Sequence, residues 1–438
     1  MDYTVSEVIK FVEENDVKFI RLAFCDLYGR QKNISIMPGE LSRAFERGIP
    51  FDASAVTGFT DAEQSDLLLF PDPATLAVLP WRPQHGRVVR FFCNLKHPDG
   101  SQFAGDGRYI LRVAAQKARK MGYDCKFGAA CVFYLFELDD KGNPTHIPQD
   151  FAGYCDIAPL DKGENVRREI CLTLEQMGIT PESSHHEQGN GQNEIDFRYG
   201  DAQTVADQLI TFKSVVKTVA ARNGLYASFL PKPVMEQHGS ALHINISLFQ
   251  NGKNIFKSNR DGHCPEAESF LSGVLGRVAE ITAFLNPLVN SYARLGRMGA
   301  PKYIAWSTNN RSQLIRIPAV SGEQMRMEVR SPDASCNPYL AFALLIYAGL
   351  EGIENKKALP ASADFNAYEA SPQQTRGIPT LPEDLGAALA LAERSEFVAK
   401  HLPERTVQHF LESKRREWSS FVHAQDQAAE QAVYFATV

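Results

Sequence analysis

This chain of 438 residues lacks long apolar runs, paired cysteines and an excess of positive charge. No run approaches the ~20 apolar residues that cross a bilayer, so we expect no membrane-spanning segment. The first residues are acidic and amphipathic, without the basic and apolar regions of a signal peptide. A net charge of -6 argues against nucleic acid as the main partner.

The eight cysteines are scattered along the chain and form no CxxC pair. Most have apolar neighbours, as in AFCDL and REICLTL, which is typical of buried, reduced thiols. A zinc site or a disulfide framework is therefore disfavoured. Reduced thiols and the absence of a targeting signal predict a cytoplasmic protein.

Length and composition predict two globular domains. The chain exceeds the ~250–300 residues at which a single hydrophobic core stops growing. Its 44% apolar and 22% charged residues exclude a disordered, collagen-like or coiled-coil chain. The pattern changes near Asp106, which predicts a small first domain at residues 1–100 and a larger one at 106–438.

Periodicity predicts mixed secondary structure of the α+β class. In the first domain we expect a helix at 4–14 and two strands around a Tyr28-Gly29 turn. In the second, helices are expected at 109–121, 164–177, 204–223, 266–284 and 339–353, and strands at 132–138, 194–199, 241–249, 314–318 and 324–329. Residues 382–438 read as helical. Polar residues at alternate strand positions favour an antiparallel sheet with one wet face.

Ionisable residues recur within these strand segments, where they are costly to bury. Because strand side chains alternate between faces, two triplets are each expected to share a face: His243, Asn245 and Ser247, and Arg326, Glu328 and Arg330. Other charged residues lie in neighbouring segments: Glu182, Glu187, Glu194, Arg294, Arg311 and Arg316. Any single one is more typical of a surface ion pair, and His185 and His186 alone read as turn residues. Together they predict a site for Mg²⁺ or Mn²⁺ and for polyanions.

Seven segments carry a family resemblance. In chain order over about 16–343 they are FDASAV, GAACVFYLF, HHEQGNGQNEI, PKPVMEQHGSALH, NSYARL, NNRSQLIRIP and RMEVRSPDASCNPYLAFA. They resemble the glutamine synthetase family. This implies a small N-terminal β-grasp domain and a larger catalytic domain with an antiparallel sheet and flanking helices. It also implies a homo-oligomer, usually a dodecamer of two hexameric rings, whose neighbouring subunits share active sites.

The resemblance implies a ligase that condenses glutamate with ammonia, or with a small amine in related members, using ATP and Mg²⁺ or Mn²⁺. It carries over residue by residue. The implied metal ligands are Glu187, Glu194, His243 and Glu328; the glutamate contacts are Gly239, Arg294 and Arg330; the nucleotide contacts are Glu182, Tyr199, Ser247 and Arg326; and the catalytic residues are Arg311, Arg316 and Asp52, the last offered by a neighbouring subunit.

Three departures from the family pattern fall on acids. Ala130 and Val132 stand where a Glu-x-Glu strand supplies one ligand to each metal, and Gly299 stands where a flap acid precedes Ala-Pro. Each metal therefore keeps two of three expected protein ligands. Disturbing even a supporting partner of a metal costs ~10–100-fold, and a general base is worth ~10²–10⁴-fold in rate. We expect glutamine formation to be impaired.

Two alternatives remain open. One is an active glutamate–amine ligase or glutamine synthetase with altered metal or amine use, because a bulkier or neutral amine needs the flap acid less. The other is a catalytically silent homologue that binds a nucleotide or an amino acid, or that serves as a structural subunit.

Overall fold

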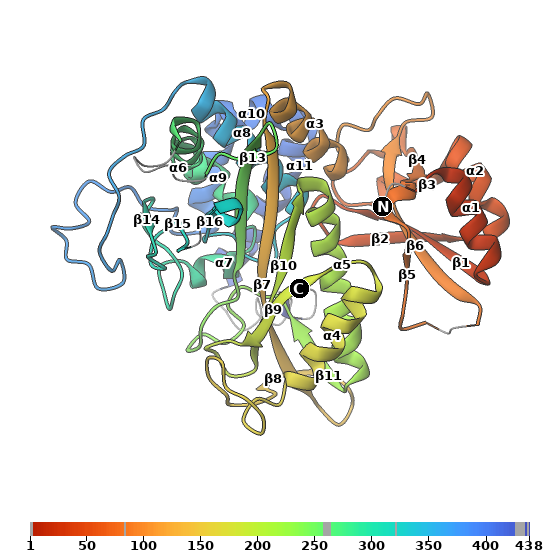
Figure 1. Ribbon diagram of the computed structural model, residues 1–438, viewed down its shortest axis with the longest axis horizontal. Coiled ribbons are helices and arrows are strands. Elements are labelled where there is room, and N and C mark those ends of the chain that lie inside the picture. Colours follow the sequence, from red (N-terminus) through yellow and green to blue (C-terminus); the bar gives the residue numbers. More distant parts are fainter. Residues whose placement is uncertain (1–2, 83–84, 257–263, 320–321, 425–433, 436–437) are drawn as a thin grey trace.

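The computed structural model describes residues 3–82, 85–256, 264–319, 322–424, 434–435 and 438. Two β-sheets lie side by side, the smaller formed by the N-terminal part of the chain (Figure 1). Each sheet contributes to its own cluster of buried apolar side chains. No helix in the described ranges combines the length and apolar character needed to cross a membrane.

The smaller sheet has the strand order β2-β1-β6-β4-β3, with β5 paired to β6. Its strands are β1 (Val17–Cys25), β2 (Gln31–Ile36), β3 (Ile49–Asp52), β4 (Asp66–Pro71), β5 (Ala77–Val78) and β6 (Arg87–Lys96), and its helices are α1 (Val5–Glu14) and α2 (Leu41–Arg47). Thr4 and Glu7 form a capping box that starts α1. The predicted N-terminal helix and the hairpin around Tyr28-Gly29 are confirmed.

The larger sheet has the order β14-β15-β16-β12-β7-β10-β9 and is antiparallel except for the β14–β15 pair. Its strands are β7 (Asp124–Leu138), β8 (Pro144–Pro148), β9 (Pro181–His186), β10 (Gln192–Asp201), β11 (Leu225–Ser228), β12 (Leu242–Gln250), β13 (Lys253–Asn254), β14 (Trp306–Thr308), β15 (Ile315–Ile317) and β16 (Met327–Val329). The predicted strands are confirmed, although β16 begins only at Met327, after a 3₁₀ turn at Gly322–Gln324. The prediction that His185 and His186 are turn residues is wrong, because both pair with β10 as part of β9.

Helices build the remainder of the larger unit. They are α3 (Gly107–Lys120), α4 (Glu164–Gln176), α5 (Ala202–Arg222), α6 (Pro265–Leu285), α7 (Val289–Arg294), α8 (Pro338–Glu354), α9 (Leu385–Arg394), α10 (Glu396–His401) and α11 (Glu404–Ala424). The five helices predicted between residues 109 and 353 are confirmed as α3, α4, α5, α6 and α8. The helical segment predicted at 382–438 is confirmed as α9 to α11 up to Ala424, and its residues 425–433 and 436–437 lie outside the described part of the chain. Helix α8 is buried almost throughout, and its Phe342 ring stacks on Phe127 of β7 at 4.3 Å.

Strand β7 separates this core from the opposite face of the sheet. Its odd-numbered residues, including Phe127, Cys131 and Phe133, belong to the core cluster. Its even-numbered residues Ala130 and Val132 point the other way and line cavities. The period-two alternation of a strand thus gives β7 one packing face and one face for a site.

A buried arginine joins the two units. The Arg108 guanidinium donates two hydrogen bonds to the Asp207 carboxylate, at 3.0 and 2.9 Å, and reaches Asp72 of the smaller unit at 3.0 Å. The Tyr339 hydroxyl donates to the same Asp207 carboxylate at 2.6 Å. Because every charge in this network is paired, it fixes the smaller sheet against α5 and α8 without leaving an isolated buried ion.

Candidate active site

Strands β12, β7 and β10 bring chemically important residues into rows on one face of the larger sheet. His243 on β12 lies opposite Ala130 on β7, and Ala130 lies opposite Asp196 on β10. Val132, two positions after Ala130 on β7, lies opposite Glu194 on β10. Residues directly opposite each other in an antiparallel pair share a face, so these five side chains border one space above the sheet.

Two cavities open on this face. The first cavity, of about 180 Å³, is lined by Ala130, Glu182, Asp196, Tyr199, Asn245, Ser247, Arg316, Arg326 and Glu328, among others. The second cavity, of about 840 Å³, is lined by Val132, Glu187, His238, Gly239, Arg294, Gly299, Arg330 and Tyr368, among others. Glu194, His243 and Arg311 border both cavities. A group bound in one cavity can therefore meet a group bound in the other at these three residues.

Glu328 is the centre of a buried ion-pair network, which we call the arginine wall: Arg316, Glu328, Arg330 and His243. The Glu328 carboxylate accepts hydrogen bonds from Arg316 at 2.9 Å and Arg330 at 3.1 Å, and lies 3.7 Å from the His243 imidazole. Burial acts to raise the pKa of Glu328, but the opposing charges of its partners hold that pKa at about 2. Burial, then Arg330, lowers the pKa of His243 to about 3, so its imidazole is neutral and free to bind a metal.

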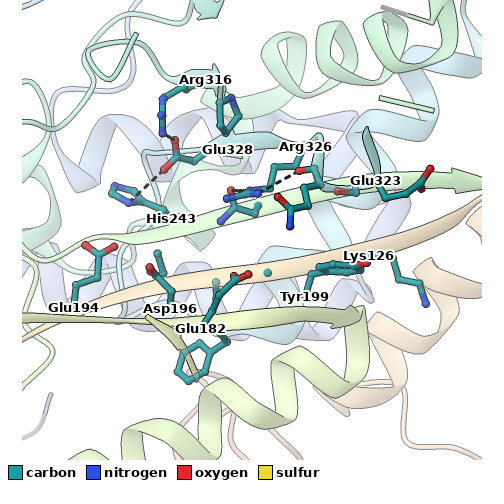
Figure 2. Close-up of a pocket in the computed structure, with 18 of the residues that line it drawn as sticks. Lys126, Glu182, Glu194, Asp196, Tyr199, His243, Arg316, Glu323, Arg326 and Glu328 are labelled. Carbon is teal, nitrogen blue, oxygen red and sulfur yellow. Dashed lines mark hydrogen bonds and ion pairs between the residues drawn. The ribbon is translucent and has the colours of Figure 1, made fainter. Parts of the chain in front are cut away.

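Across the first cavity from the arginine wall, carboxylates project from β10 (Figure 2). His185, Glu187 and Glu194 form what we call the carboxylate group, with one potential ligand atom of each within 4.8 Å of the others. The His185 imidazole lies 3.1 Å from the Glu187 carboxylate. Burial raises the pKa of Glu194 well above its usual value, and Asp196 and Glu187 raise it further. This excess of negative charge favours a cation at the carboxylate group.

The two substituted strand positions lie beside these groups. Ala130 occupies the row between His243 and Asp196, and Val132 the position next to Glu194. A carboxylate at either position would extend from β7 into the space that the ligands border. Ala130 and Val132 themselves supply no oxygen ligand, and in the described part of the chain His185 forms a three-residue cluster with Glu187 and Glu194.

The residues expected to hold a nucleotide, Glu182, Tyr199, Ser247 and Arg326, all line the first cavity. Two of them have protein partners there. The Arg326 guanidinium donates to the Asn245 amide oxygen at 3.0 Å, and the Ser247 hydroxyl donates to the Met325 carbonyl at 3.0 Å. The Tyr199 ring is half exposed and stacks parallel to Phe249 at 6.5 Å.

The residues expected to contact glutamate, Gly239, Arg294 and Arg330, line the second cavity. Gly239 has a packing reason to be glycine, because an added Cβ would lie 2.6 Å from the Pro231 carbonyl oxygen and 2.7 Å from Arg294 Cγ. The buried Arg294 guanidinium donates to the backbone carbonyls of Ser331 at 2.7 Å and Arg330 at 2.9 Å. These bonds fix the guanidinium at the cavity wall.

Two residues from the predicted set call for separate description. Asp52 ends β3 in the smaller unit, where its carboxylate accepts hydrogen bonds from the Ser54 amide at 3.0 Å and the Ser54 hydroxyl at 2.6 Å. It lines neither cavity of its own chain. Gly299 lines the second cavity with φ +88°, a left-handed conformation that a glutamate would adopt only with strain.

Asp196, His238 and Tyr368 are among the lining residues that were not predicted from the sequence. Asp196 lies two residues after Glu194 on β10, so the alternation rule could have found it. It accepts a hydrogen bond from Ser183 through one oxygen, while its buried Oδ1 has no partner in the described part of the chain. His238 directly precedes Gly239 in the segment MEQHGSALH, and only that position hinted at its importance. Tyr368 comes from a loop with no pattern that the sequence makes visible.

Known proteins resemble the chain over nearly its whole length. The family model of the glutamine synthetase β-grasp domain matches residues 16–98, and that of the glutamine synthetase catalytic domain matches residues 104–433. A glutamine synthetase of Clostridium saccharobutylicum is 44% identical over 424 residues, covering 96% of both chains. One of Methanosarcina mazei is 46% identical over 426 residues, covering 95% of both. A solved structure of a GmaS/ADP complex is 30% identical, with a TM-score of 0.87 over 99% of both chains.

Proposed function

Because this chain belongs to the glutamine synthetase family, we propose that it is an ATP-dependent ligase joining the γ-carboxylate of glutamate to ammonia or a small amine. The observation that carries this proposal is the meeting of the two cavities at Glu194, His243 and Arg311. A phosphate donor in the first cavity there faces a carboxylate acceptor in the second. Such placement is the main contribution that proteins make to phosphoryl transfer.

Each part of the site has a role in this reaction. Glu182, Tyr199, Ser247 and Arg326 hold ATP in the first cavity. That a structural relative has been solved with ADP supports nucleotide binding in general, not these positions. Arg311 and Arg316 stabilise charge on the transferred phosphoryl group, since arginines bind phosphate through several donors. Gly239, Arg294 and Arg330 hold glutamate in the second cavity.

The two proposed positions for divalent cations differ in how well the residues present can bind an ion. Glu187 and Glu194 hold the first ion with His185, a set of two carboxylates and one imidazole that suits Mn²⁺ better than Mg²⁺. His243 and Glu328 are the ligands for a second ion, but Glu328 is already neutralised by Arg316 and Arg330. When bound, such ions neutralise the triphosphate. With Ala130 and Val132 beside them, metal binding is weakened and glutamine formation is slow.

The ligase acts as an assembly. Asp52 lines neither cavity of its own chain, so we assign it to the ammonium site of a neighbouring subunit in a dodecamer of two hexameric rings. Exposed apolar side chains at 151–160 support subunit contacts: Phe151 is 77%, Ile157 75% and Leu160 61% exposed in a single chain. We place the assembly in the cytoplasm and divide each subunit into domains at 1–100 and 106–438.

A catalytically silent homologue that binds nucleotide or glutamate is the second candidate. The observation that favours it is the arginine wall, where Arg316 and Arg330 occupy both oxygens of the Glu328 carboxylate. A site whose metal ligand is already paired with cations can bind anions without turning them over.

Phosphate release from ATP distinguishes the two candidates. The full-length protein is incubated with ATP, glutamate and either Mg²⁺ or Mn²⁺, and the acceptor is varied from ammonium to small amines and polyamines. Release that depends on glutamate and on one acceptor, and is faster with Mn²⁺, is expected of the ligase. Silence with every acceptor, together with an ATP-induced rise in melting temperature that Arg316→Ala abolishes, would establish the silent homologue.

A further inference from the structure

The second cavity has few groups that can accept a proton from an incoming amine. Glu187 and Glu194 are the carboxylates lining it within the described ranges, and both belong to the proposed metal site. Gly299, on the loop that borders the cavity, contributes no side chain. At neutral pH ammonia and alkylamines exist mainly as ammonium ions, whose nitrogen has no lone pair for attack. The reaction therefore requires a base on the acceptor side of the cavity.

His238 lies where such a base is needed. It lines the second cavity opposite Gly299, whose position for a Cβ atom is 3.8 Å from the His238 Cδ2 atom. Its backbone is fixed, because the His238 carbonyl accepts a hydrogen bond from the Tyr134 hydroxyl at 2.6 Å. The neighbouring Gly239 carbonyl accepts from the Gln192 amide at 3.1 Å. No hydrogen bond engages the His238 ring within the described part of the chain, so its nitrogens are available to a ligand.

The surroundings keep this imidazole neutral. Burial lowers the pKa of His238 below its usual value, and the nearby Lys232 ammonium lowers it further, while Glu187 acts in the opposite direction. The position of the Lys232 ammonium is itself fixed, because it donates to the Gln237 carbonyl and lies 3.5 Å from the sulfur of Met298, the residue before Gly299. Arg294 and Lys302 add positive charge to the same cavity. A neutral ring keeps a free lone pair on one nitrogen, which is the form that a general base requires.

We propose that His238 is the base that removes a proton from the amine acceptor, in place of a carboxylate at Gly299. This role rests on the proposed ligase function. An ammonium ion gives one proton to a ring nitrogen of His238, and the freed lone pair attacks the carbonyl carbon of γ-glutamyl phosphate. The new C–N bond forms, the bond from that carbon to the phosphate oxygen breaks, and phosphate leaves with the second proton of the nitrogen. His238 then returns its proton to water.

Acceptors that differ in protonation test this role. Methylamine is protonated at pH 7 and needs a base, whereas hydroxylamine is a neutral nucleophile at that pH and does not. For His238→Asn and His238→Gln we expect kcat/KM for methylamine to fall by ~10²–10⁴-fold, with hydroxamate formation from hydroxylamine nearly unchanged. The acidic limb of the wild-type pH profile with methylamine should also disappear. His409→Asn on α11, which lines neither cavity, is the matched control.

Each outcome is decisive. Equal losses with both acceptors in variants that retain the ATP-induced rise in melting temperature would make His238 a binding residue and overturn the proposal. No loss with methylamine would overturn it as well. If the wild-type protein forms neither amide nor hydroxamate, the ligase function itself fails, and the role of His238 fails with it.

Discussion

The arginine wall and the carboxylate group, whose Glu194 borders the first cavity together with His243, Arg316 and Glu328, are balanced in different ways. In the arginine wall, the Glu328 carboxylate is shared by two guanidinium groups, so charges of both signs are paired within the protein. In the carboxylate group, Glu187 and Glu194 lie close together, and their partners in the described part of the chain include the His185 imidazole and the Gln188 backbone amide but no guanidinium group. The charges of the arginine wall are balanced without a ligand, whereas the negative charge of the carboxylate group is balanced only when a cation binds.

In the proposed ligase, this difference would allow the site to keep its anion-binding arginines while its binding of metals changes. Buried ion pairs are stable when each partner stays in place, so the arginine wall persists whatever happens on β7. Ala130 and Val132 remove charge from the side that was already unbalanced. In the proposed ligase we expect these substitutions to lower both the repulsion among carboxylates in the metal-free protein and the affinity for the metal.

Removing the central carboxylate of the arginine wall should have the largest effect on stability. Glu328→Ala leaves the buried guanidinium groups of Arg316 and Arg330 without their shared partner. We expect the free energy of unfolding to fall by about 3–5 kcal/mol, as measured by urea denaturation. The control is Glu14→Ala, which removes an exposed partner 3.7 Å from Lys10 and should cost less than about 0.5 kcal/mol. Equal, small losses in both variants would show that the wall is solvated and contributes little.

Adding carboxylates to β7 should increase the affinity of the proposed site for metal ions. We expect Ala130→Glu combined with Val132→Glu to raise Mn²⁺ affinity by about 10–100-fold, the range that a single supporting partner is worth. Electron paramagnetic resonance of free Mn²⁺ measures this affinity. Without metal the variant should melt at a lower temperature, because the new charges lie beside Glu194 and Asp196. The matched control, with Gln at both positions, adds the same bulk without charge. An equal affinity for Mn²⁺ in both variants would exclude these positions from the metal site.

The sequence predicts the elements of this site better than their balance of charge. Alternation placed His243 with Asn245, and both line the first cavity from β12. It also placed Arg326, Glu328 and Arg330 together; of these only Glu328 lies within β16, although the Arg330 guanidinium does donate to the Glu328 carboxylate. The pairing of Glu328 with Arg316 was not visible, because it depends on the register between β15 and β16, which lies in no local pattern. Register is fixed by contacts between distant segments.

Loop residues were harder to predict than strand residues for a related reason. His238 and Tyr368 reach the second cavity from segments without periodicity. The left-handed φ of Gly299 likewise comes from the shape of its loop. A glutamate at position 299 would carry backbone strain, because side chains disfavour that conformation. The two positions on β7 have ordinary strand backbone, so carboxylates can be added there without that cost.

The smallest effect that we expect concerns the charge of Glu194 in the metal-free protein. Its pKa is raised in the folded state, first by burial and then by Asp196 and Glu187. The folded protein thus holds this proton more tightly than the unfolded chain, and stability is lost as pH rises from the usual carboxyl range through the raised pKa. Glu194→Gln removes that loss. We therefore expect the variant to be more stable than the wild type at neutral pH, with no gain at acidic pH.

Urea denaturation at several pH values measures this gain, with Glu182→Gln at the exposed rim of the first cavity as the control. Mn²⁺ should reverse the order of stability, because the ion stabilises the wild-type carboxylate pair and loses a ligand in the variant. A variant that is less stable than the wild type in metal-free buffer at neutral pH would mean that Glu194 is already compensated within the protein. The contrast with the arginine wall would then fail, because both sides of the cavity would be complete without a ligand.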